Sequence, residues 1–274
     1  MTTTTVARSS SGLTRRQRAR LNRWVQYAVG LLVILFLAAK TDWASMADSF
    51  ARGDVAASMF PRLLTEALKN TLIYTGLAFV FGLGLGLLIA MMKLSSIGPY
   101  RWVANGYVEL FRGLPALVVL FMVAYGIPNA FPGFQFPGDI YGKVTVGLGL
   151  TAAAYMAETI RAGIQAVPKG QWEAARSLGM GPGRTMFSII IPQAFRVVIP
   201  PLTNELILLV KDSSLVYVVG VSIAQYELTK FGQSFLNSKA NATPLIVVAL
   251  SYLAITLPLS SLVRALEKRF AKAR

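Results

Sequence analysis

Residues 171–195 read QWEAARSLGMGPGRTMFSIIIPQAF. The segment begins with a charged, helix-favouring run, breaks at GMGPG and then becomes apolar. Pro168 and Gly170 are expected to end the preceding helix. Glu173 is expected in the first turn of a new helix, where its carboxylate favours the positive end of the dipole, and Gly179 suits the C-terminal end. The segment therefore predicts a helix about 12 Å long, followed by a turn at residues 181–183.

The composition of the whole chain is that of a membrane protein. Of its 274 residues, 54% are hydrophobic and only 14% are charged, and the mean hydropathy is +0.55. A soluble domain could not hide so much apolar surface, whereas long apolar runs separated by short polar segments are typical of a protein with several membrane spans. The composition predicts an all-α integral membrane protein.

The apolar runs predict about six transmembrane helices. They cover residues 24–39, 71–92, 114–130, 144–164, 197–219 and 244–263. The first run could also be the apolar part of a cleaved signal peptide, but its long basic leader and strong hydropathy favour a retained helix. In the second run, Gly82 and Gly86 form a GxxxG pair that would allow another helix to approach closely.

The distribution of lysine and arginine predicts the orientation of the chain in the membrane. Most of the 27 Lys and Arg residues lie in residues 1–23, in the segments after the second and fourth runs, and at the C-terminus. The positive-inside bias places both termini and residues 165–195 in the cytoplasm. The sequence thus predicts a disordered basic cytoplasmic tail at 1–23, an additional transmembrane helix with an external linker at 24–60, and a main transmembrane domain at 61–274.

Residue content argues against several function classes. The chain has no Cys and no His, which removes the usual zinc sites and the Ser/His/Asp and Cys/His nucleophilic arrangements. No metal site and no catalytic residue are predicted. A net charge of +15 could suggest nucleic acid, but the basic residues are distributed by membrane side, so no nucleic-acid partner is expected.

Ionisable and amide groups at membrane depth are costly and therefore are candidates for a translocation pathway or gate. The candidates are Glu158, Asn204, Glu205, Lys211, Asp212 and Ser213. Two structural alternatives remain open. Glu158 could simply pair with Arg161 on one helix face, and Lys211 and Asp212 could cap a helix end near lipid headgroups.

The order of residues in the opening segment resembles a family motif. Glu173-Ala174-Ala175, then Gly179, and later Ile189 and Ile191-Pro192 match the EAA motif of permeases in ATP-binding-cassette (ABC) importers. Ile191 stands where the family usually has Leu. Four further segments resemble the polar amino-acid branch of that family, and the resemblance covers roughly residues 61–274. They are FRGLP (111–115), AAYMAETIRAGI (153–164), IPQAFRVVIPPLTNE (191–205) and KDSSLVYVVG (211–220).

The resemblance implies the type I ABC importer fold and a membrane subunit that docks a separate ATPase. The implied coupling residues are Glu173, Ala174, Ala175, Leu178 and Gly179. The chain contains no GxxxxGK[ST] phosphate loop, so it needs no cofactor of its own, and ATP and Mg²⁺ would be bound by the partner. The implied partners are a cytosolic ABC ATPase dimer, a second permease subunit, an extracytoplasmic solute-binding protein, a polar amino acid such as glutamate, glutamine or arginine, and the lipid bilayer of the cell membrane.

Three alternatives are weighed against this interpretation. A secondary amino-acid or ion transporter would account for charges in the membrane but not for the EAA spacing. An intramembrane enzyme is disfavoured because the chain lacks His, Cys and a clustered carboxylate pair. A membrane scaffold without transport activity would be distinguished by solute uptake into reconstituted vesicles.

Overall fold

The protein is described by a computed structural model over residues 15–271. Those residues form helices and connecting segments without a β-strand, which confirms the predicted all-α class. The chain divides into two compact units, residues 1–49 and residues 50–274. Each unit is described separately.

The first unit is dominated by one long helix. Helix α1 (Arg15–Lys40) has no buried residue and is followed by α2 (Trp43–Phe50). The predicted disorder is wrong for residues 15–23, which are the first turns of α1, while residues 1–14 lie outside the described part. The segment RRQRARLNR is helical because Arg, Gln, Ala and Leu all have high helix propensity.

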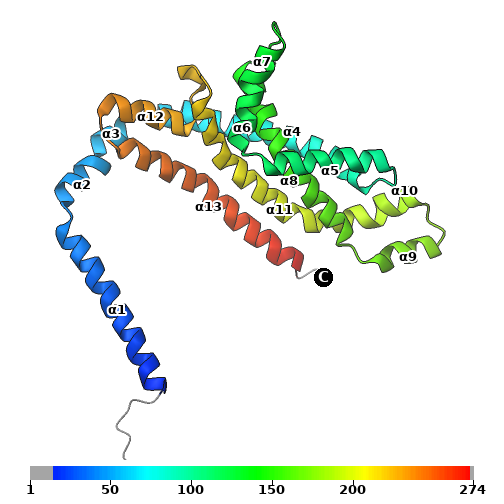
Figure 1. Ribbon diagram of the computed structural model, residues 1–274, viewed down its shortest axis with the longest axis horizontal. Coiled ribbons are helices and arrows are strands. Elements are labelled where there is room, and N and C mark those ends of the chain that lie inside the picture. The colour runs from blue at the N-terminus through cyan, green and yellow to red at the C-terminus, as the bar shows by residue number, and fades with distance from the viewer. Residues whose placement is uncertain (1–14, 272–274) are drawn as a thin grey trace, which may run out of the picture. The chain divides into compact units, whose positions relative to one another are not determined.

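The second unit contains the remaining helices (Figure 1). Its α-helices are α3 (Gly53–Ser58), α4 (Lys69–Leu94), α5 (Gly98–Gly113), α6 (Ala116–Phe121), α7 (Ile127–Ala130), α8 (Ile140–Gln165), α9 (Lys169–Ser177), α10 (Pro182–Thr185), α11 (Ile191–Asp212), α12 (Leu228–Lys239) and α13 (Thr243–Ala271). Its π-helical segments are η1 (Leu63–Leu68), η2 (Met122–Gly126) and η3 (Met186–Ile190), and its 3₁₀ segments are η4 (Ser213–Val218) and η5 (Ile223–Gln225).

The packing of α4 against α8 is the most extensive helix contact in this unit. A Cβ at Gly82 would lie 3.2 Å from the Ala152 Cβ, and one at Gly86 would lie 2.9 Å from the Ala153 carbonyl oxygen. Both glycines are buried. The predicted close approach at the GxxxG pair is therefore confirmed, and α8 is the helix that approaches.

The apolar helices support fewer spans than the six predicted. Within residues 15–271, four helical runs are long and apolar enough to cross a membrane, or five if one bent pair counts as a single span. The four runs are residues 15–40, 63–94, 182–218 and 243–270. Helix α8, which contains the predicted span 144–164, is long but less apolar, because it is rich in Gly, Ala and Thr and carries Glu158. Since α8 is largely buried among other helices, it needs little lipid-facing apolar surface.

The bent pair includes a helix that the sequence did not predict. Helix α5 meets the run of α6, η2 and α7 at an angle of 106°, and the chain turns at Leu114 and Pro115. Residues 98–113 lie between the second and third predicted spans, where no helix was predicted. They form an amphipathic helix instead, which buries Ala104 and Val108 while its other side is exposed.

The segment that follows α9 is also more helical than expected. From Pro182 to Val218 the chain runs through α10, η3, α11 and η4 as one helical span. The predicted coupling loop 165–195 thus contains α9, and the long span begins inside it. Between the fifth and sixth predicted spans the chain likewise forms a helix, α12.

The α4–α8 contact can be tested with one substitution. Gly86→Val should lower the thermal stability of the purified protein by the equivalent of about 1–3 kcal/mol, because the new side chain would overlap the α8 backbone. Gly84→Val is the matched control, since a Cβ at Gly84 meets nothing within 4 Å. Equal melting temperatures for the two variants would contradict the packing described.

Candidate functional site

Pro168 and Gly179 set the two ends of helix α9. Pro168 caps the N-terminus in an extended conformation, and its carbonyl accepts a hydrogen bond of 2.9 Å from the Gln171 backbone N–H. At the other end Gly179 has a left-handed φ of +77°. The Met180 N–H donates to the Ala175 carbonyl at 3.0 Å, and the Gly179 N–H donates to the Arg176 carbonyl at 2.9 Å. This is a Schellman ending, so the predicted role of Gly179 in ending the helix is confirmed.

The position of Glu173 in the helix differs from the prediction. Because Pro168 already supplies the helix start, α9 begins at Lys169, Gly170 lies inside it, and the first turn contains no acidic residue. Glu173 therefore lies beyond the first turn, where a carboxylate gains less from the helix dipole.

Helix α9 is attached to the rest of the unit by one face. Ala175 is only 4% exposed, and Trp172 is half-buried against a cluster that includes Met186 and Ile189 of η3. The Gln193 side-chain amide on α11 donates to the Gln171 side-chain oxygen on α9 at 3.3 Å. A displacement of α9 would therefore be transmitted to the start of the long helix.

The opposite face of α9 is open. Glu173, Ala174 and Gly179 are exposed, and Leu178 is 82% exposed. Of the two adjacent alanines implied as coupling residues, Ala174 is exposed, whereas Ala175 is buried against the unit. A partner could contact a surface formed by Glu173, Ala174 and Leu178, with no bulky side chain at its centre.

A cavity adjoins the segment that leads into α9. It has a volume of about 700 Å³ and lies between that segment, α11 and the end of α13. It is lined by Ala166, Val167, Pro168, Gln193, Arg196, Val197, Pro200, Pro201, Glu267 and Phe270. The segment that leads into α9 thus borders open space.

Glu158 lies in a charge network between α4 and α8. Its carboxylate forms an ion pair with the Lys93 Nζ and accepts a 2.7 Å hydrogen bond from the Arg161 guanidinium. Arg161 in turn donates to the Gln165 side-chain oxygen at 2.5 Å, at the last residue of α8. The alternative in which Glu158 pairs with Arg161 is confirmed, and Lys93 is a partner that sequence reasoning missed. The network ties the end of α4 to the end of α8 from which α9 continues.

The other pathway candidates lie on α11 and at its end. Asn204 and Lys211 are exposed, and Glu205 and Asp212 are half-buried. At 100° per residue these four side chains occupy one face of the helix. Among residues 15–271, the side chains of Asn204 and Glu205 form no hydrogen bond or ion pair. The face carries an amide, two carboxylates and an ammonium group, and is separate from the Glu158 network.

Ser213 does not share this open face. It is fully buried, and its hydroxyl donates to the Val210 carbonyl at 2.7 Å. Lys211 and Asp212 are the last two residues of α11, and the chain continues directly into η4. The structure therefore brings together four of the six pathway candidates and leaves Glu158 and Ser213 in other environments.

Comparison with known proteins gives consistent similarities. Residues 82–272 match the model of a family described as "Binding-protein-dependent transport system inner membrane component". The probable glutamine ABC transporter permease protein GlnM of Bacillus subtilis (strain 168) is 41% identical over 76% of this chain and 93% of its own. The L-cystine transport system permease protein TcyB of the same organism is 43% identical over 59% of this chain and 68% of its own. Among solved structures, an amino acid ABC transporter with histidines is similar with a TM-score of 0.67 and 37% identity, covering 84% of this chain and 99% of that one.

The Glu158 network can be tested by exchanging its charges. Glu158→Lys alone should destabilise the protein by about 2 kcal/mol or more, because it places a third positive charge beside the partly buried Lys93 and Arg161. Adding Lys93→Glu should recover a large part of the loss. Glu66→Gln, which removes the exposed pair with Arg62, is the control and should cost less than 1 kcal/mol. Absence of recovery in the double variant, measured by thermal unfolding, would refute the network.

Proposed function

The chain belongs to the family of binding-protein-dependent transport system inner membrane components, and we propose that it works as the permease subunit of an ATP-driven importer of polar amino acids. The observation that carries this proposal is helix α9: one face is packed against η3, and the other is open to a partner. The relatives GlnM and TcyB are named for glutamine and L-cystine. Because their named substrates differ, the proposal covers the amino-acid class and no single amino acid.

The open face of α9 is where a separate ATPase would dock. Ala174 and Glu173 present a surface onto which another protein can pack, and the exposed Leu178 supplies an apolar side chain for a pocket on the partner. ATP and Mg²⁺ would be bound by that partner. Two ATPase subunits that approach each other on binding ATP would move α9, and α9 would move the ends of α8 and α11.

The open polar face of α11 is proposed as part of the translocation pathway. Carboxylates and an ammonium group on one face suit the ammonium and the carboxylate of an amino acid. Groups of this kind in a membrane-spanning helix are costly unless they line a cavity or meet a partner. We therefore expect a second permease subunit, identical or related, to face α11 across the pathway, and a solute-binding protein to deliver the amino acid from outside the cell.

The docking role of α9 is tested with a bulky residue on its open face. Ala174→Trp should reduce both ATPase co-purification and solute uptake at least tenfold, while insertion of the chain into the membrane stays normal. The control is Asn237→Trp, at an exposed position of α12 at the other end of the unit. Uptake at the normal rate in the Ala174 variant would refute the assignment of α9.

The role of the α11 face is tested separately. Glu205→Gln keeps the size of a half-buried, unpaired side chain but removes its charge, so it should lower uptake at least threefold while ATPase co-purification is unchanged. Glu109→Gln makes the same replacement at an exposed position of α5 and should have no effect. Unchanged uptake kinetics in the Glu205 variant would remove this residue from the pathway.

A further inference from the structure

Helix α12 lies at the end of the second unit opposite α9 (Figure 1) and is held there partly by apolar packing. Leu228 and Phe231 of α12 are buried in a cluster with Met59, Leu63 of η1 and Val248 of α13. Additional contacts join α12 to η4, where the Gln233 side-chain amide bonds the Tyr217 hydroxyl. Because η4 continues directly from α11, the position of α12 affects the end of the helix that carries the open polar face.

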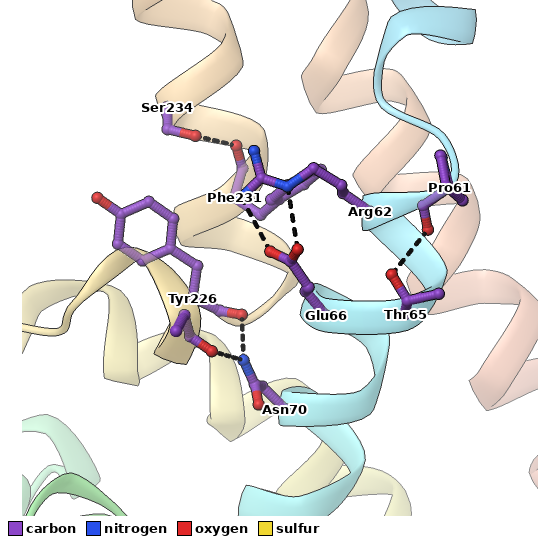
Figure 2. Close-up of polar contacts among 9 residues, drawn as sticks. Pro61, Arg62, Thr65, Glu66, Asn70, Tyr226, Phe231 and Ser234 are labelled. Atoms are coloured by element: carbon purple, nitrogen blue, oxygen red, sulfur yellow. Dashed lines mark hydrogen bonds and ion pairs between the residues drawn. The ribbon is translucent and has the colours of Figure 1, made fainter.

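The segment that leads into α12 is fastened to α4 by buried polar groups. The Asn70 side-chain amide donates to the carbonyl oxygens of Ala224 and Tyr226, at 2.9 and 3.0 Å. The Tyr74 hydroxyl donates to the Gln225 carbonyl at 2.9 Å. Figure 2 shows Asn70 pointing from the α4 helix toward this segment, one turn beyond the exposed Arg62–Glu66 pair. The entry to α12 is therefore fixed before the helix begins.

Glu227 is the residue at which these contacts meet. Its side chain is completely buried, and its carboxyl group caps α12 by accepting hydrogen bonds from the Thr229 and Lys230 backbone N–H groups, at 2.5 and 2.7 Å. The Tyr252 hydroxyl of α13 bonds the same carboxyl group at 3.1 Å. One buried carboxyl group thus joins the start of α12 to α13, next to the point where the Leu228 N–H donates to the Thr71 hydroxyl of α4.

We propose that Glu227 is the positioning residue for helix α12, and that the strength with which it holds the helix start depends on whether its carboxyl group carries a proton. The proposal rests on the geometry of the buried cap. It does not require the proposed function, since it concerns the anchoring of α12 whatever the bundle transports.

The direction of the proton dependence follows from burial. Burial raises the pKa of Glu227 to about 7, and this outweighs the lowering by the Thr229 and Lys230 N–H groups and by Tyr252. A carboxyl whose pKa is raised in the docked state favours docking when it is protonated. Docking of α12 should therefore be strongest at acidic pH, should weaken as the pH rises from about 5 to 7, and should level off above that.

The other charged and titratable groups around Glu227 do not account for a change of charge between pH 5 and 8. Tyr252 of α13 and Tyr74 of α4 face it, and phenols of this kind stay protonated throughout the range from pH 5 to 8. On α12 itself, the Lys230 ammonium lies over the Tyr217 and Tyr226 rings, 5.0 and 5.9 Å from their centroids. Arg62, which directly precedes η1, and Glu66 of η1 pair with each other at the surface. Glu227 is therefore the group in this cluster that changes charge in that range.

The test is amide hydrogen exchange of the full chain in lipid nanodiscs, followed by mass spectrometry from pH 5 to pH 8 and corrected for intrinsic exchange. In the wild-type protein the opening equilibrium of the peptide that contains Thr229 and Lys230 should rise at least tenfold between pH 5 and 7. Glu227→Gln, which cannot ionise, should make the opening independent of pH. Glu227→Ala, which removes the cap, should be pH-independent and about fivefold more open than Glu227→Gln.

Two controls separate anchoring from general loss of structure. Glu66→Gln changes an exposed carboxylate one helix turn from Asn70 and should keep the wild-type pH dependence. Peptides from the α4–α8 contact should exchange equally slowly in all variants, because that contact is made by Gly82 and Gly86 against α8 and involves no residue of α12. A wild-type opening equilibrium that is flat between pH 5 and 8, or one that keeps its pH dependence in Glu227→Gln, would overturn the proposal.

Discussion

The close contact of α4 with α8 is the constraint on which the rest of the second unit depends. Gly82 and Gly86 let the two backbones touch, and a side chain at either position would displace α8. In a membrane, where apolar burial does not draw helices together, such contact of small residues is a main source of association. It places Glu158 beside Lys93 and directs the end of α8 into α9.

The two surfaces proposed to be functional, on α9 and α11, lie at different points along one helical run. Helix α9 contacts η3 at the beginning of the run from Pro182 to Val218, and the open polar face of α11 lies farther along it. A rigid helix transmits a displacement at one end to the other, whereas a flexible loop would absorb it. The half-buried Trp172 and the buried Ala175 attach α9 to the unit, so its exposed residues can contact a partner without any loss of packing.

Much of this arrangement could be predicted from the sequence, because it is encoded locally. The glycine spacing predicted a close helix contact, and Gly179 predicted the end of α9. Features set by tertiary contacts could not be predicted. Lys93 is 65 residues away from Glu158, and Ala175 cannot be distinguished from Ala174 until the helix has a neighbour.

Other differences between the prediction and the structure are explained by the residues of the helices concerned. Helix α5 was missed because its apolar residues line only one face and its length is short for a span. The predicted count of six spans exceeds the four or five that length and hydropathy support. Helix α8 does not meet these criteria, because many of its residues are small and pack against other helices. Glu173 was placed one turn too early because Pro168, rather than Gly170, sets the start of α9.

The most direct test of the central claim, that α9 is a cytoplasmic docking helix, uses the absence of cysteine from the chain. A single Leu178→Cys variant is treated with a membrane-impermeant maleimide in intact cells and in inside-out vesicles. The account predicts labelling only in inside-out vesicles, with protection when the ATPase is bound. Labelling of Cys at this position from outside intact cells would place α9 on the wrong side of the membrane and contradict the account.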